Sequence, residues 1–169
     1  ACGLIDSQRH ARDCRLGIGA GTKAEAVIIA GDIYDRSSPS AEAVDLLDEV
    51  LSRLVQDMRV AVIAIAGNHD NPDRVDYGAR IFRDRSLHIR GTLPVSFEPV
   101  IVEDADGAVY FYPVPYCSPA AARVARADEG IATHADVMER CGAAIRAAHP
   151  ENRRSVLVAH AFVGGGIES

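Results

Sequence analysis

The sequence lacks several features that would narrow its function at once. No apolar run approaches the ~20 residues that a membrane-spanning helix needs, so we expect no membrane span. The 4 cysteines, Cys2, Cys14, Cys117 and Cys141, contain no C-x-x-C pair, and the N-terminus does not resemble a secretory leader. We therefore expect reduced thiols in a cytoplasmic protein.

A basic excess is also missing. The sequence has 18 Lys and Arg against 24 Asp and Glu, and its net charge of −6 argues against a wholly basic nucleic-acid-binding surface. A phosphate-ester substrate remains compatible with this charge, because bound divalent cations supply positive charge locally.

The length and ends of the sequence suggest one domain that belongs to a longer protein. With 169 residues, 48% of them hydrophobic, the chain can bury a sizeable core. It begins at Ala1 rather than Met and stops shortly after Gly164-Gly165-Gly166, a run typical of a loop. We expect a segment of something longer, in which residues 25–169 form part of a domain.

Residues 1–24 are an unassigned lead-in. The glycines over 17–21 resemble a dinucleotide loop, but no strand precedes them, so that interpretation is not favoured. Asp6, His10 and Cys14 stand at helical spacing, yet without a preceding strand or a fourth ligand they do not make a convincing metal site.

Two polar stretches stand out, Gly31-Asp32-Ile33-Tyr34-Asp35-Arg36 and Gly67-Asn68-His69-Asp70. Each follows an apolar, β-branched run, over 26–30 and 60–66 respectively, which predicts strands buried on both faces of a parallel sheet. Open α/β sheets place their ligand crevice at the carboxyl ends of the strands. Carboxylate, amide and imidazole groups at that edge suit a divalent cation such as Mn²⁺.

An amphipathic helix is predicted between these two strands. Ser37-Ser38-Pro39-Ser40 is a typical helix start, and apolar residues then recur at three- and four-residue steps from Val44 to Val55. The strand, helix and strand form a βαβ unit, whose crossover should be right-handed.

Further elements are predicted downstream. Asp104-Ala105-Asp106-Gly107 predicts a hairpin between strands over 95–102 and 108–114, rather than a calcium loop, because the later glutamate is missing. The remaining expected elements are a turn at 71–73, a short helix at 79–82, a short strand at 87–90, helices over 118–128 and 133–148, and a strand over 155–159.

Several aromatic and histidine residues outside the two stretches are expected to be structural. His88 alternates with apolar neighbours, which predicts a position facing solvent or a sheet edge. His149 follows a predicted helix, where the helix dipole favours a structural role. The aromatic cluster favours packing over base stacking, because no Arg or Lys is interleaved; it comprises Tyr110, Phe111, Tyr112 and Tyr116.

His160 differs from those histidines. It stands at the carboxyl end of the strand predicted over 155–159, the same kind of position that Asp32 and Asn68 occupy. With two other candidate ligands in equivalent places, metal binding is the favoured interpretation. We expect Asp32, Asn68 and His160 to meet at one rim of a sheet, close enough to hold a cation between them.

These motifs support a resemblance to a known family. The Gly-Asp-x-x-Asp-Arg stretch followed by Gly-Asn-His-Asp resembles the calcineurin-like metallophosphoesterases. The wider runs over 30–40, 65–70 and 156–163 are similar to the SbcD-type DNA exonuclease subunits of that family. The resemblance covers about residues 25–169 and implies an α/β fold with a β-sandwich core flanked by helices.

The resemblance also implies an activity and partners. It implies a nuclease that uses two Mn²⁺ ions to hydrolyse DNA phosphodiesters in double-strand-break processing, works with an SbcC-type ATPase subunit and forms a homodimer. By the same resemblance, Asp32 bridges the two ions, Asn68 and His160 bind the second ion, and His69 lies beside the scissile phosphate. Asp35 would orient His69, and Arg36 would touch the phosphate.

The sequence also departs from the family pattern. The first motif, Asp-x-His after an opening strand, is absent, and the last motif, Gly-His-x-His, would lie beyond Ser169. We therefore expect at most one weakly held ion and little nuclease activity from this segment alone. Two alternatives stay open: another calcineurin-like phosphoesterase, and a degenerate, non-catalytic domain that docks a partner.

Overall fold

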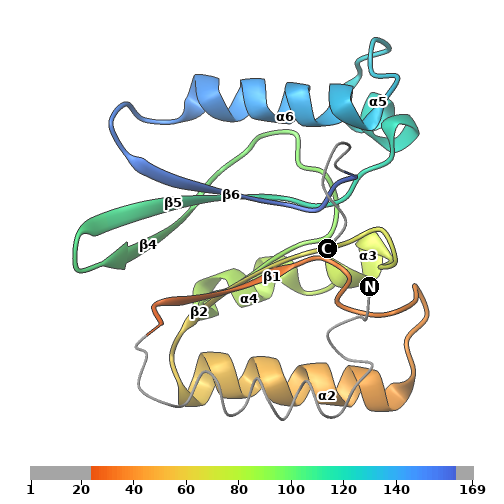
Figure 1. The fold of residues 1–169 in the computed structure, drawn as a ribbon. Helices are drawn as coiled ribbons and strands as arrows, with labels where there is room; N and C mark the ends of the chain where they lie inside the picture. The colour runs from red at the N-terminus through yellow and green to blue at the C-terminus, as the bar shows by residue number, and fades with distance from the viewer. Residues whose placement is uncertain (1–23, 163–169) are drawn as a thin grey trace, which may run out of the picture.

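The fold is a layered arrangement of helix, sheet, sheet and helix. The computed structural model describes residues 24–162 of the chain. Figure 1 shows α2 beneath a first sheet, a second sheet above it, and α6 on top. Each sheet has 3 strands, in the orders β1-β2-β3 and β4-β5-β6. The predicted α/β fold with a β-sandwich core flanked by helices is confirmed.

The first sheet is entirely parallel and contains the predicted βαβ unit. Pairing places Ala30 opposite Ile65 and Ile65 opposite Arg90, so all three strands end at the same edge. The Ser40 hydroxyl caps the connecting helix by accepting a hydrogen bond from the Ala43 N–H at 3.3 Å. The elements are β1 (Ala26–Ala30), α2 (Ala41–Ser52), a π-helical turn η1 (Arg53–Asp57), β2 (Ala61–Ile65) and β3 (Leu87–Arg90).

The second sheet is mixed. The central strand β5 pairs antiparallel with β4 and parallel with β6, and Asp104 lies opposite Gly107 in the predicted hairpin, which is confirmed. Thr133 and Asp136 form a capping box at the start of the long covering helix. The elements are β4 (Val100–Asp104), β5 (Gly107–Val114), α5 (Pro119–Arg126), α6 (His134–Ala148) and β6 (Arg154–Ala159).

The core consists of three apolar layers, and β2 supplies two of them. Val62 and Ala64 pack toward α2, whereas Ile63 and Ile65 pack between the sheets against Phe111 and others. A third layer joins the second sheet to α5 and α6, with Tyr112 and Cys141 among its buried members. Alternation along one strand therefore fills two layers, as the two-residue period of a strand requires.

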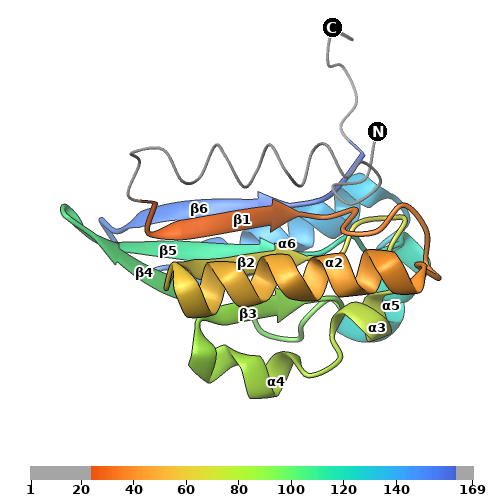
Figure 2. The ribbon, with the colours of Figure 1, turned by 90° about the horizontal axis from the view of Figure 1, so that it is seen from below.

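The burial predicted for two other strands is wrong. Ile28 on β1 is 41% exposed and Leu157 on β6 is 51% exposed, so neither strand is buried on both faces. Among residues 24–162, each of these strands lies at an edge of its sheet. Figure 2 shows β6 lying alongside β1, which places the two exposed edges together. A run of apolar residues predicts a strand but not its place in the sheet.

Two local predictions also differ from the structure. The strand expected over 95–102 begins only at Val100, directly after Pro99, which lacks the backbone N–H that a ladder needs. The turn expected at 71–73 starts a one-turn helix, α3 (Pro72–Val75), capped by the Asn71 side chain. Beyond it lie α4 (Ala79–Phe82) and a 3₁₀ turn, η2 (Arg83–Arg85).

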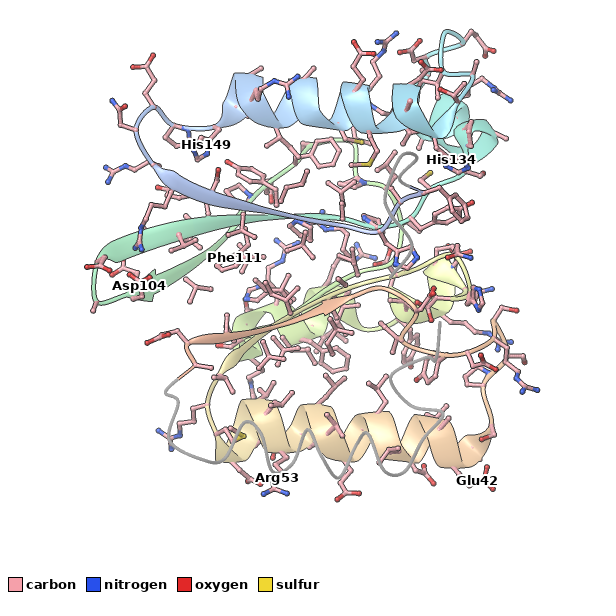
Figure 3. All side chains as sticks on the ribbon, in the orientation of Figure 1. Glu42, Arg53, Asp104, Phe111, His134 and His149 are labelled. Atoms are coloured by element: carbon pink, nitrogen blue, oxygen red, sulfur yellow. The ribbon has the colours of Figure 1, made fainter. Side chains whose placement is uncertain are left out.

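The isolated histidines behave as predicted. His88 is half-buried on the edge strand β3. His149, labelled in Figure 3, ends α6; its Nδ1 lies 3.0 Å from the Tyr112 hydroxyl and its Nε2 lies 3.0 Å from the Arg153 carbonyl oxygen. These contacts join the end of α6 to β5 and to the turn that precedes β6, which is a structural role.

The aromatic prediction holds in part, and the thiols of the described part of the chain are free. Phe111 and Tyr112 are buried in the core, but Tyr116 packs elsewhere, against His134 and His160. Cys117 and Cys141 are unpaired, and burial raises the pKa of both thiols. Cys2, Cys14, Asp6, His10 and the glycines over 17–21 lie outside the described residues. Over residues 24–162, no helix has the length and apolar character to cross a bilayer.

Candidate metal centre

The loop that follows β1 turns sharply to present Asp32. Gly31 and Asp32 both have positive φ, 93° and 49°, a conformation that glycine and aspartate tolerate better than most residues. A side chain at Gly31 would collide with the His160 ring and the backbone of Gly67, and one at Gly67 would collide with Asp32. The two glycines therefore allow the loops after β1 and β2 to approach each other closely.

Asp32, Asn68 and His160 converge at one point. The His160 Nε2 lies 2.9 Å from the Asn68 Oδ1 and 3.6 Å from the Asp32 Oδ1. Asp32 and Asn68 follow strands of the first sheet, whereas His160 follows β6 of the second. The expectation that all three lie on the rim of one sheet is therefore wrong, because the carboxyl ends of β1, β2 and β6 meet at the same end of the sandwich.

The hydrogen bonding of His160 leaves a lone pair facing this point. Its Nδ1 lies 2.9 Å from the Ala30 carbonyl oxygen, which can only accept a hydrogen bond, so Nδ1 carries the proton. In a neutral imidazole the Nε2 is then an acceptor, and so is the Asn68 Oδ1 at 2.9 Å. Two facing acceptors suit a cation bound between them, whereas without a cation a flipped Asn68 amide would donate to the same nitrogen.

The donor set fits a divalent cation. Neighbouring ligands around one ion, each about 2.1 Å from it, are about 3 Å apart, close to the separations around the His160 Nε2. A backbone carbonyl that accepts from the other ring nitrogen is the usual support of a metal-binding histidine. Among residues 24–162 no group of three or more His, Cys, Asp or Glu side chains is placed to hold a metal ion. This site has only two such side chains, Asp32 and His160, and its third donor is the amide oxygen of Asn68.

His69 stands beside these residues on the solvent side. Its backbone N–H donates to the Asp32 Oδ1 at 3.2 Å, and its ring Nδ1 lies 3.1 Å from the backbone oxygen of Asp35. The Asp35 carboxylate instead lies 3.6 Å from the exposed Arg36 guanidinium. The expectation that the Asp35 carboxylate orients His69 is therefore corrected: the main chain makes the contact, which a sequence motif cannot distinguish.

Comparison with known proteins identifies the family. The sequence matches the calcineurin-like phosphoesterases over residues 7–124. The chain belongs to this family. It is also 30% identical over 166 residues to the SbcD subunit of the SbcCD nuclease from Staphylococcus saprophyticus, an alignment that covers 98% of this chain and 43% of that protein. The chain thus spans less than half the length of this relative.

Asp70, the last residue of the second stretch, joins the two phosphoesterase loops. It is the buried charged side chain of the described core, 6% exposed. Its Oδ2 accepts from the N–H groups of Ile33 at 3.0 Å and Gly67 at 2.8 Å, and its Oδ1 accepts from the Tyr34 N–H at 2.9 Å. No role was predicted for Asp70 from the sequence. The one feature that could have indicated a role is its position as the acidic last residue of the motif that follows β2.

A group of aromatic and histidine rings borders the candidate metal centre next to His160. Tyr116 packs edge-on against His160, with ring centroids 6.3 Å apart, and also contacts His134 and Phe162. Tyr116 thus connects the His160 ring to His134 and Phe162. The pKa of Tyr34 is raised mainly by burial and to a smaller extent by the nearby Asp70 carboxylate, so this phenol stays neutral at physiological pH.

Proposed function

We propose that this chain carries the metal-binding part of a Mn²⁺-dependent DNA phosphodiesterase of the SbcD type. The observation that supports the proposal most strongly is the pair of facing acceptors, the His160 Nε2 and the Asn68 Oδ1, with the Asp32 carboxylate beside them. Asp32, Asn68 and His160 would hold the ion. When bound, a divalent ion of this kind polarises a phosphoryl oxygen and makes water a better nucleophile near neutral pH.

The remaining residues act on the substrate in this proposal. The contact of the His69 Nδ1 with the Asp35 backbone oxygen fixes the ring and leaves Nε2 for proton transfer at the scissile phosphate. Arg36, with its side chain 73% exposed, is available to contact a phosphate oxygen. Asp70 positions both loops without touching the substrate.

DNA as substrate and an ATPase as partner rest on the comparison. The relative from Staphylococcus saprophyticus is named as part of a nuclease, which supports a nucleic acid substrate and an SbcC-type partner for the protein that contains this chain. We extend the proposal to a homodimer in a cytoplasmic DNA-repair complex. Another phosphoesterase activity remains the main alternative, because the family motif does not determine the substrate.

The test uses the natural gene product that contains these 169 residues. We expect Mn²⁺-dependent release of nucleotides from the ends of duplex DNA, and a loss of at least about 100-fold in the His69→Ala variant. Asp32→Ala should be equally inactive, whereas the exposed neighbour variant Asp73→Ala should cleave normally. Full cleavage by both His69→Ala and Asp32→Ala would contradict the proposed centre.

The choice of substrate is tested separately. The same protein is given a small aryl phosphodiester and a duplex DNA end at equal concentration. Faster turnover of DNA supports the nuclease proposal. Turnover of the small diester with none of DNA would favour the alternative phosphoesterase.

A further inference from the structure

A second polar cavity lies at the edge of the sandwich, apart from the candidate metal centre. It has a volume of about 400 Å³ and is bordered by β3, α4, the segment before β4, and part of β5. None of Asp32, Asn68, His69 or His160 lines it. Its charged and titratable lining residues are Asp76, Arg80, Arg83, His88, Arg90 and Glu98. Figure 2 shows β3 and α4 on the side of the first sheet opposite β1.

The strand register explains why cationic groups line this cavity. His88 pairs with Ile63 and Arg90 pairs with Ile65, and paired residues on neighbouring strands point to the same face. Ile63 and Ile65 fill the layer between the two sheets. His88 and Arg90 therefore continue this layer at the edge of the sheet, where apolar residues give way to half-buried basic ones.

The positive charge of the three arginines there is offset only in part by the carboxylates of Asp76 and Glu98. Within residues 24–162, neither Arg83 nor Arg90 has a carboxylate at ion-pair distance. Asp76 lines the same cavity, but its two oxygens already accept hydrogen bonds from the Gly91 N–H and from the N–H and hydroxyl of Thr92. Glu98 is exposed.

The pKa directions agree with this geometry. Burial lowers the pKa of His88, and the charges of Arg83 and Arg90 lower it further. Burial also lowers the pKa of Arg90; Arg83 adds to this effect, whereas the carboxylates of Asp76 and Glu98 oppose it. Two guanidinium groups that repel each other across a cavity favour an anion between them.

We propose that this cavity binds the terminal phosphate of a phosphorylated organic molecule, held by Arg83 and Arg90. Guanidinium groups recognise phosphate oxygens through paired hydrogen bonds, and two of them match the two charges of a phosphate monoester. The volume falls within the usual range for small-molecule sites, roughly 300–1,000 Å³, and exceeds what a phosphate alone fills. Pro94, Pro99 and Val100 supply apolar lining for an attached organic group.

The same chemistry could come from a free nucleotide or from the 5′-phosphate of a DNA strand. Binding of deoxyadenosine 5′-monophosphate to the 169-residue chain is measured by calorimetry in EDTA, so that no metal contributes. We expect Arg83→Gln and Arg90→Gln to weaken binding at least 10-fold, and Arg146→Gln, an exposed arginine on α6, to leave it unchanged. Asp32→Ala should also bind normally, which separates this site from the proposed metal centre.

Two further ligands complete the test. Deoxyadenosine, which lacks the phosphate, should not bind. A DNA hairpin with a 5′-phosphate is compared with the same hairpin ending in a hydroxyl, and a preference for the phosphorylated hairpin over the mononucleotide identifies DNA as the source. Equal binding of the nucleotide by the native chain, Arg83→Gln and Arg90→Gln would overturn the proposal, as would no binding at millimolar concentration. Because Arg83 is exposed, its variant tests the site even if Arg90→Gln does not fold.

Discussion

Replacing Asp70 by alanine should destabilise the protein more than any surface substitution. The carboxylate accepts three backbone hydrogen bonds, from Ile33, Tyr34 and Gly67, and Ile33 and Gly67 are buried. Each hydrogen bond to a charged group contributes about 1.5–3 kcal/mol, and a buried donor left without an acceptor adds to the loss. Because the bond from the Tyr34 N–H is only partly buried, we count the two buried bonds and expect the Asp70→Ala variant to lose about 3–6 kcal/mol of unfolding free energy.

Urea unfolding followed by circular dichroism at pH 7 measures this loss. Asp70→Asn should lose about half as much, because one oxygen can still accept from Ile33 and Gly67 while the new NH₂ group faces the Tyr34 N–H. Asp45→Ala, at an exposed position on α2, is the control and should change stability by less than about 0.5 kcal/mol. An Asp70→Ala midpoint equal to that of Asp45→Ala would refute the role of Asp70 in joining the loops.

Three other predictions follow from the fold. Burial and the charges of Arg83 and Arg90 lower the pKa of His88 in the folded chain. The unfolded chain therefore takes up a proton first as the pH falls below 6.5, so the free energy of unfolding should decrease there. The His88→Gln variant should show a smaller decrease in thermal midpoint between pH 7 and pH 5 than the native chain. Thr133→Ala removes the capping box of α6 and should lower the unfolding free energy by about 1 kcal/mol in urea titrations, and no change would contradict the cap. The Gly31→Ala variant places a side chain against the His160 ring, at a residue with positive φ, so it should change the His160 imidazole signals in NMR spectra. Unchanged signals would show that Gly31, after β1, and His160, after β6, are not in close contact.

Much of the fold follows from patterns within short stretches of the sequence. The βαβ unit, the Asp104–Gly107 hairpin and the helix over 133–148 were predictable because the residues that determine them are close neighbours in sequence. Strand burial was not predictable in the same way. The runs that form β1 and β2 are similarly apolar, yet β2 lies at the centre of its sheet and β1 at its edge, which depends on the pairing of distant segments.

The candidate site shows the same limit. Asp32, Asn68 and His160 could be selected because each follows a strand, but the sequence did not reveal that His160 comes from the other sheet. The contact of the His69 ring with the Asp35 backbone oxygen could not be predicted from the sequence either, because every residue has a carbonyl oxygen. Asp70 was missed because its partners are backbone N–H groups, which leave no sequence signature.

The most direct test of the central claim is a calorimetric titration of the 169-residue chain with Mn²⁺. If Asp32, Asn68 and His160 share one ion, the chain binds Mn²⁺ at a single site that is lost in the His160→Ala variant. The site should be retained in the His149→Gln variant, because His149 lies near the start of β6 whereas His160 follows its end. An identical Mn²⁺ isotherm for the native chain and His160→Ala would show that these three residues do not form the metal centre.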